Sequence, residues 1–555
     1  MPLPPRTECG RRSERLDGVP GNLARPVEAG PPLEPQSTDR TPLLMITAEE
    51  AWPVFETLFL EARKEVRMGF RIFDLSTPLY SPRAREVGRD WFDLVIHTLG
   101  RGVDVWLALA DFDPVVGAEI HRLTWRSMRM FAAAEELARA SGATGRLRVI
   151  AALHPASVAP IARLALYLNI RAEIVERIGL LRSMKEAVRD RALAEMPGLS
   201  RHVLRHGPKV RASRWPVPEL IPATHHQKMA VFDRERLYIG GLDLNPRRFD
   251  TKVHDRPAAD TWHDVQVLVD GPVAADAHAH LAGFLDECAR RRPVEPKRGR
   301  LLRTLSTSRS WQGVSMSPRP AIREIEAAHL DALEKVERFV YLESQFFRSR
   351  HVARALAAAA RRNPHLTCIL LLPAAPEELA FENRSKPDMR YGEFLQARCL
   401  RKIERAFGDR LFVATPAAPR RMPEEVRRAH VRAGVRAAPL VYVHAKVSIF
   451  DDSLCLVTSA NLNGRSMRWD TEAGVAFTDP AVVRRFRDRL FAHWLPEEAG
   501  REFYAPSTAK GAWARLGAEN AARAPERRRG FVMPYDTDLA EAFGADLPVI
   551  PEEMV

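Results

Sequence analysis

Apolar runs of two kinds alternate along most of the chain. Helix-like periodicity over residues 47–64 and 91–99 alternates with strand-like apolar runs over residues 66–73 and 103–110. Short buried strands that alternate with amphipathic helices are typical of a parallel sheet covered by helices. Further strands are predicted near Met229 and over residues 237–239 and 265–269, and a helix over residues 274–291.

The same plan returns in the second part of the chain. Helices are predicted over residues 321–337, 352–361 and 391–407, and strands over residues 339–347, 366–372 and 411–414. The repeat predicts an α/β protein of two related halves about a pseudo-twofold axis, each half a mainly parallel mixed sheet flanked by helices. The predicted division is a disordered tail over residues 1–40, halves over residues 41–292 and 301–500, a basic linker over residues 293–300, and a C-terminal tail over residues 501–555.

Two segments leave alternatives open. Residues 115–200 are predicted to be mostly helical and are long for a simple crossover; helices packed on the sheet are favoured over a cover for a cleft or a contact with lipid. Residues 419–436 carry six arginines just before the second motif described below. A solvated basic loop is favoured there over a contact with a headgroup or membrane.

Composition narrows the class of partner. The 555 residues carry a net charge of +13, which favours phosphate-rich partners such as anionic membranes, phospholipids or nucleic acid. Five widely spaced cysteines form no disulfide or zinc pattern. The longest apolar stretch, residues 156–170, is interrupted by Arg163 and is too short to span a membrane. We therefore expect a cytoplasmic protein, with peripheral contact to an anionic membrane compatible with its charge.

One motif occurs twice with the same internal spacing. Residues 224–233 read THHQKMAVFD and residues 444–451 read HAKVSIFD, so each copy is His-x-Lys followed, after four residues, by Asp. Residues two apart in a strand share a face, so His226 and Lys228 point the same way, and His225 points away. An imidazole beside an ammonium suits a phosphate, because lysine attracts its oxygens and histidine attacks phosphorus or transfers a proton.

On these motifs the chain resembles the phospholipase D superfamily, whose signature is the doubled His-x-Lys-x4-Asp. The resemblance covers about residues 45–500. It extends to the Trp-His-Asp segment at residues 262–264, to residues 341–347 (YLESQFF), and to Asn461, Asn463, Arg465, Ser466 and Glu472.

The resemblance implies roles for these residues. His226 would be the nucleophile that forms a phosphohistidine, and His444 the general acid and base. Lys228 and Lys446 would hold the phosphate, and Asp264 and Glu472 would orient the motif histidines through hydrogen bonds. The residues implied to bind phosphate are Ser459 and Asn461 in the second half, with Gly241 and Asp243 as their equivalents in the first.

Three departures and exclusions complete this interpretation. Asp243 stands where the family has Asn, and a carboxylate near phosphate repels it unless it is protonated or turned away. The motif acids Asp233 and Asp451 are interpreted as structural. We expect no cofactor and no metal in the site, because the motif lysines oppose a cation, and His278 is interpreted as a surface or packing residue.

Four functions remain in competition. The leading hypothesis is a phospholipase D-like hydrolase or phosphatidyltransferase that acts on phospholipid, with water or an alcohol as acceptor. A cardiolipin synthase, which passes a phosphatidyl group to phosphatidylglycerol, uses the same chemistry. A nuclease of this superfamily is less favoured because no basic–aromatic module for nucleic acid stands out. The fourth is a non-catalytic scaffold that binds phospholipid.

Overall fold

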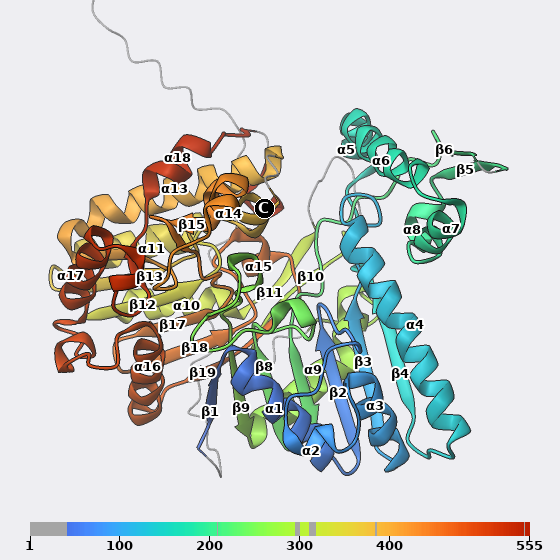
Figure 1. Ribbon diagram of the computed structural model, residues 1–555, viewed down its shortest axis with the longest axis horizontal. Helices are drawn as coiled ribbons and strands as arrows, with labels where there is room; N and C mark the ends of the chain where they lie inside the picture. The colour runs from blue at the N-terminus through green and yellow to red at the C-terminus, as the bar shows by residue number, and fades with distance from the viewer. Residues whose placement is uncertain (1–40, 208, 295–299, 310–317, 383–385, 549) are drawn as a thin grey trace, which may run out of the picture.

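The protein is built on two large mixed sheets that share an apolar core, with helices packed on both faces of each sheet (Figure 1). The structure is a computed structural model, and it describes residues 41–207, 209–294, 300–309, 318–382, 386–548 and 550–555. The predicted N-terminal tail and most of the predicted linker lie outside these residues. The mixed α/β class predicted from the sequence is confirmed.

The first sheet has seven strands in the order β1-β9-β8-β7-β2-β3-β4. Strands β2, β3 and β4 are parallel to one another, and the remaining neighbours are antiparallel. The motif strand β7 lies at the centre, and all four of its residues are buried. The bounds are β1 Leu43–Ile46, β2 Glu65–Phe70, β3 Asp104–Ala110, β4 Leu147–Ala152, β7 Met229–Phe232, β8 Arg236–Gly240 and β9 Val265–Asp270.

The second sheet repeats this order in seven of its nine strands. Its order is β11-β10-β19-β18-β17-β12-β13-β14-β20, and β10-β19-β18-β17-β12-β13-β14 match the first sheet strand for strand in direction. The bounds are β10 Leu301–Thr307, β11 Arg319–Arg323, β12 Phe339–Ser344, β13 Thr367–Leu371, β14 Leu411–Pro416, β17 Lys446–Phe450, β18 Leu454–Thr458, β19 Glu472–Phe477 and β20 Val532–Pro534.

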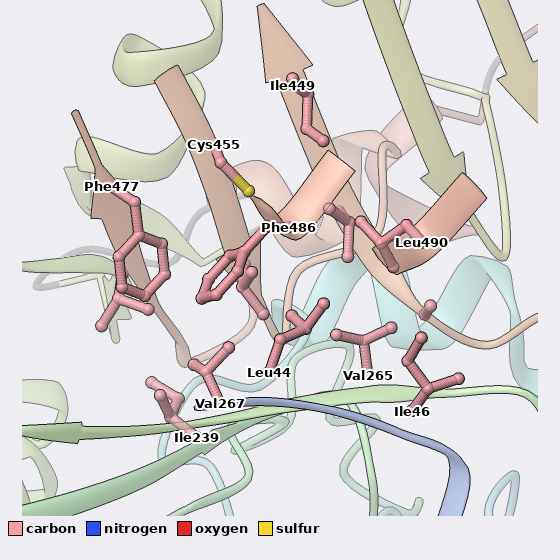
Figure 2. Close-up of a cluster of buried hydrophobic side chains, with 14 of the residues drawn as sticks. Leu44, Ile46, Ile239, Val265, Val267, Ile449, Cys455, Phe477, Phe486 and Leu490 are labelled. Carbon is pink, nitrogen blue, oxygen red and sulfur yellow. The ribbon is translucent and has the colours of Figure 1, made fainter. Parts of the chain in front are cut away.

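Helices flank both sheets, and a single apolar core joins the two halves. Figure 2 shows Leu44, Ile239 and Val267 of the first half facing Cys455 and Phe486 of the second. Because this core contains strands from both halves, neither half is an independent hydrophobic unit. The main helices are α1 Thr47–Glu61, α3 Trp91–Gly100, α4 Ala118–Ala140, α9 Pro272–Cys288, α10 Glu324–Lys335, α11 Arg350–Arg362, α13 Pro387–Phe407 and α16 Pro480–Trp494.

Residues 115–200 are more than packed helices. They include the parallel strand β4, and beyond it a small subdomain with its own apolar core, built around Ile170, Ile174 and Ile178. This subdomain projects from one corner of the molecule (Figure 1). Its elements are α5 Pro160–Ala165, α6 Tyr167–Arg182, α7 Glu186–Ala194, α8 Pro197–Ser200, β5 Val203–His206 and β6 Lys209–Ala212.

Residues 501–555 differ from the predicted tail, because they complete the second half. Strand β20 pairs antiparallel with β14 at the sheet edge. Helix α17, Ala509–Ala522, buries Trp513 against Phe491 and Tyr341. Helix α18, Thr537–Phe543, contacts α13. Among the described residues, no helix is both long enough and apolar enough to cross a membrane.

Candidate active site

The two motif histidines stand at equivalent places in the two sheets. His226 lies just before β7, which runs antiparallel to β2, and His444 lies just before β17, which runs antiparallel to β12. Each histidine therefore enters its sheet at the carboxyl ends of the parallel strands, the edge where α/β proteins commonly build ligand sites.

The main chains of the two halves are joined at this edge. His226 N donates to Thr471 O at 2.9 Å, and Thr471 N donates to Thr224 O at 2.8 Å. The mirrored bonds run from His444 N to His263 O at 2.7 Å and from His263 N to Tyr442 O at 2.8 Å. Each motif thus forms a short parallel bridge with the segment that carries the acid of the other half.

Each histidine pairs with the acid of the opposite half. His226 Nδ1 lies 2.9 Å from Glu472 Oε1, and His444 Nδ1 lies 2.6 Å from Asp264 Oδ2. The acids thus orient the motif histidines as the resemblance implies, although the partner is not the histidine that precedes each acid in the chain. The reason is strand spacing: Asp264 lies just before β9, two strands from β7, so about 10 Å separates it from His226.

Burial sets the ionisation of these pairs. Burial first, and then Lys228, Arg71 and Lys446, lowers the pKa of His226 well below its ordinary value. Burial likewise lowers the pKa of His444 well below that value, with Lys446 as the next cause. Burial raises the pKa of Glu472 to about 8. Both imidazoles are therefore neutral at neutral pH in the ligand-free protein.

The motif lysines form a buried cationic pair beside the histidines. Lys228 Nζ donates to His226 O at 2.5 Å, and Lys446 Nζ donates to His444 O. Burial lowers the pKa of both ammonium groups, and that of Lys446 falls to about 7. An anion between them would restore their charge, because an opposite charge nearby favours the ionised form.

The residues predicted to bind phosphate divide into two groups. Asn461 is buried, and its Oδ1 has no hydrogen-bond partner among the described residues. The Ser459 hydroxyl donates to Glu472 Oε2, so this serine supports the acid that holds His226. The main-chain N–H of Gly241 already donates to Val265 O at 3.1 Å, and an added Cβ would meet Asp264 Oδ1 at 2.1 Å. Gly241 is therefore needed to make room for Asp264, and its N–H is not free for phosphate.

Asp243 is turned toward partners of its own. Its Oδ1 accepts the N–H of Ile72 at 2.9 Å, and its Oδ2 lies 3.9 Å from Arg71 Nη1. A buried carboxylate with a guanidinium partner no longer presents an unopposed charge to a phosphate. The ligand role implied for Asp243 has no support in this geometry; the residue positions Arg71.

The motif aspartates fasten loops at the far ends of the motif strands. Asp233 accepts the N–H groups of residues 63–65 at 2.8–3.0 Å, and Asp451 accepts those of residues 337–339 at 2.8–2.9 Å. Both aspartates have a positive φ, of 53° and 51°, in the left-handed region that Asp tolerates better than most residues. The repeated geometry agrees with the structural role predicted for them.

Sequence reasoning missed two arginines that face the histidines. Arg71, at the end of β2, lowers the pKa of His226, and Arg248 lowers that of His444. The Arg248 guanidinium stacks 3.5 Å from the centroid of Trp262, whose ring in turn lies 4.6 Å from the ring of His444. Arg71 could have been predicted from its position, because polar residues at the carboxyl end of a parallel strand commonly line a ligand site.

The neighbouring His225 is excluded from the cleft. Its Nδ1 lies 2.7 Å from Thr471 Oγ1, and its ring packs edge-on against Phe284 in the core. This placement agrees with the alternation of side chains expected along a strand. His278, on α9, lies 3.0 Å from Glu65, which agrees with its predicted surface or packing role.

Comparison with known proteins gives one family match and several curated relatives named phospholipase D. The family described as "Cardiolipin synthase, PLD-like domain" matches residues 330–494. Phospholipase D1 of Schizosaccharomyces pombe is 24% identical over 373 residues, which are 50% of this chain and 27% of that protein. Phospholipase D A of Dictyostelium discoideum is 23% identical over 326 residues, 47% of this chain and 25% of that protein.

A plant relative and a solved structure extend the set. Phospholipase D gamma 1 of Arabidopsis thaliana is 21% identical over 383 residues, 46% of this chain and 44% of that protein. The chain thus spans less than half the length of these curated relatives. The crystal structure of phosphatidylserine synthase from Haemophilus influenzae Rd KW20 matches with a TM-score of 0.45 and 11% identity, over 87% of this chain and 94% of that one. The family match over residues 330–494 and the curated relatives support the resemblance of the chain to the phospholipase D superfamily.

Proposed function

We propose that the protein is a phospholipase D-type enzyme that transfers a phosphatidyl group from phospholipid to water or an alcohol through a phosphohistidine. The observation that carries the proposal is the pair of crossed contacts, His226 with Glu472 and His444 with Asp264, beside two buried lysines. Two imidazoles oriented by acidic side chains, with lysines beside them, suit in-line displacement at a phosphodiester.

The proposed reaction has two steps. His226 Nε2 attacks phosphorus, the bond to the leaving alkoxide breaks, and His444 donates the proton that makes it an alcohol. Water or an acceptor alcohol then attacks phosphorus as His444 takes its proton, and the bond to His226 breaks. Lys228 and Lys446 hold the non-bridging oxygens, whose charge grows in each transition state.

The assignment of nucleophile and general acid to the two histidines follows the family resemblance, because the two histidine–acid pairs, or dyads, are nearly symmetric. In each dyad the carboxylate faces Nδ1 and leaves Nε2 for chemistry. The neutral imidazole of the ligand-free protein suits a nucleophile. The general acid needs a proton before the first step, and the bound phosphate anion raises the pKa of the nearby His444 toward that state.

The projecting subdomain suggests how a lipid would reach this site. Leu164 and Leu168 of α5 and α6 are 65% and 78% exposed, and Ile161 is 61% exposed at helical spacing from them. The subdomain leaves the first sheet after β4, at the same edge where His226 enters β7. We propose that this apolar surface rests on the phospholipid surface.

The basic segment before the second motif has less charge available for such a contact. Arg421 pairs with Glu526, Arg427 and Arg428 pair with Glu424, and Arg432 donates to Ala374 O. The segment also contains a short helix, α14, Glu424–Ala429. This geometry favours the solvated basic segment over a dedicated headgroup site.

A matched set of assays tests the proposal. Labelled phosphatidylcholine with and without ethanol, phosphatidylglycerol alone, and single-stranded DNA are offered to the full-length protein. Phosphatidylethanol supports the leading function, cardiolipin supports the synthase alternative, and DNA products support the nuclease. Phospholipid binding without any product would support the non-catalytic scaffold and overturn an enzymatic role.

The nucleophile is identified separately. Acidic conditions are avoided during work-up, because phosphohistidine is preserved at alkaline pH. The quenched protein is digested, and the phosphatidyl-peptide is located by mass spectrometry. With a phosphatidyl ester of p-nitrophenol, whose leaving group needs no general acid, we expect the adduct on His226 in the wild type and in His444→Ala, and none in His226→Ala. An adduct on His444 would reverse the two roles without removing the mechanism.

A further inference from the structure

A second cluster of histidines lies behind the catalytic pair. His254 precedes the short helix η2, Ala258–Asp260; His263 lies just before β9; and His493 lies near the end of α16. One ring nitrogen of each lies within 4.8 Å of those of the other two. His254 Nε2 is 3.0 Å from His493 Nε2, although 239 residues separate them in the chain. The spacing of these histidines in the sequence therefore does not predict the cluster.

Two buried carboxylates face the outer sides of these rings. Asp250 Oδ2 lies 2.7 Å from His254 Nδ1, which leaves Nε2 to face the cluster. Glu343 Oε1 contacts His263 Nε2, and His263 Nδ1 has no hydrogen-bond partner among the described residues. A carboxylate on one nitrogen and a free second nitrogen are the usual surroundings of a histidine that binds a metal.

The charges of the cluster are unbalanced without a cation. Asp250 and Glu343 are both 0% exposed. Glu343 also accepts a hydrogen bond from the Tyr341 hydroxyl at 3.0 Å, and Asp250 accepts the N–H groups of Thr251 and Trp262. Arg420 interacts with Asp250 only electrostatically, because its guanidinium donates hydrogen bonds to the main-chain carbonyls of His254 and Arg256. Two buried carboxylates facing three imidazoles match one divalent cation.

We propose that His254, His263 and His493 bind one divalent transition-metal ion, with zinc as the best fit. Three imidazoles favour zinc and related ions over magnesium and calcium, which prefer oxygen ligands. His493 is only partly buried, so its side offers both an entry path and room for water as a fourth ligand. No step of the phosphodiester chemistry passes through this ion.

The ion would have a positioning role. His493 belongs to the second half, whereas His254 and His263 belong to the first, so the ion would join the halves. His263 O accepts the main-chain N–H of His444, and the next residue, Asp264, holds the His444 ring. A metal bound at His263 would therefore fix the segment that carries the acid of one catalytic dyad.

A hydrogen bond alone is the competing explanation. At 3.0 Å, one of the facing nitrogens of His254 and His493 can donate to the other without any ion. This explanation leaves the buried His263 Nδ1 without a hydrogen-bond partner among the described residues. It also predicts no stoichiometric metal binding, so the two explanations separate in one experiment.

The test is a cobalt titration of the full-length protein. After treatment with a chelator and dialysis, Co²⁺ is added and its visible d–d absorption is recorded; zinc content of the protein as purified is measured in parallel. We expect about one equivalent of Co²⁺, displaced by Zn²⁺, and a higher Tm with the ion bound. These readouts do not depend on turnover.

Variants locate the ion. His254→Gln and His493→Gln should each weaken Co²⁺ binding at least about tenfold, as loss of one ligand does, with circular dichroism as the check on folding. His278→Gln, outside the cluster, and His226→Ala, in the catalytic pair, should keep the spectrum. Folded wild-type protein that binds no stoichiometric Co²⁺ or Zn²⁺, or a spectrum unchanged in His254→Gln and His493→Gln, would overturn the proposal.

Discussion

The substitution Asp264→Asn tests the crossed dyads most sharply, because the surroundings of Asp264 dictate how an asparagine would sit. Asp264 Oδ1 accepts the N–H of Val265 at 2.9 Å, and Oδ2 faces His444 Nδ1 at 2.6 Å. The asparagine carbonyl has to keep the bond to Val265, so its NH₂ group faces His444. The ring must then accept at Nδ1 and carry its proton on Nε2, where it cannot act as a base.

The size of the effect follows from what is lost. Both proton transfers assigned to His444 depend on the tautomer that Asp264 selects. We expect kcat to fall about 10³- to 10⁴-fold with little change in KM, which corresponds to about 4–5.5 kcal/mol of transition-state stabilisation. The matched control is Asp286→Asn, since Asp286 is exposed and pairs only with Arg291 among the ion pairs of the described chain.

Glu472→Gln should be much milder for a structural reason. Ser459 Oγ donates to Glu472 Oε2 and also lies 3.2 Å from Ala473 O. The hydroxyl can turn its proton to Ala473 O and accept from the glutamine NH₂, so the glutamine carbonyl still faces His226 Nδ1. We expect a loss of no more than about 10²-fold, and Glu472→Gln with Ser459→Ala should lose more than the two single changes combined.

A chromogenic substrate separates the two steps. A phosphatidyl ester of p-nitrophenol has a leaving group that needs no general acid, so Asp264→Asn should release about one equivalent of p-nitrophenol in a burst and then stall. The accumulated adduct is measured by mass spectrometry. Asp264→Asn protein that turns over phosphatidylcholine within tenfold of the wild-type rate would refute the reasoning, as would a larger loss in Glu472→Gln than in Asp264→Asn.

Three further outcomes are expected. Because burial lowers the pKa of Lys446 to about 7, this group is cationic below that pH and neutral above it, so the affinity for an uncleaved phosphodiester analogue should fall by up to about tenfold per pH unit above pH 7; an affinity unchanged to pH 9 would contradict this. Asp451→Ala removes three hydrogen bonds from main-chain N–H groups and should lower the free energy of unfolding by about 1–3 kcal/mol in urea titrations. A loss of less than about 0.5 kcal/mol would argue against the structural role. Leu164→Glu with Leu168→Glu should weaken sedimentation with anionic phospholipid vesicles at least about tenfold, while Leu539→Glu, exposed on α18, should not; equal binding would remove the proposed lipid contact.

Local patterns predicted the parts of the molecule that local interactions determine. The motif strands β7 and β17 are short apolar runs and are buried throughout, so their periodicity is unambiguous. The repeated plan of the two halves was readable for the same reason. The structural role of Asp233 and Asp451 also followed, since each contacts the start of the neighbouring strand in the same way in both halves.

The elements that were missed are weakly apolar or depend on distant partners. Strand β4 lies partly exposed beside β3, so its pattern did not stand out within a helical stretch. Strand β20 has three residues and ends in Pro534, which suits an edge but gives little signal. The partner of His226 is 246 residues away, and only the docking of the two sheets shows that it is Glu472 rather than Asp264.

The crossed dyads make the catalytic geometry a property of the interface between the halves. Within each half the motif histidine and the acid are too far apart to pair, because β7 and β9 are separated by β8, as β17 and β19 are by β18. Both tautomers are therefore selected only while the shared core and the bridges through His263 and Thr471 hold the sheets in register. A perturbation that loosens this interface should lower activity before either sheet loses its strands, since the dyads depend on separations of less than 3 Å across it.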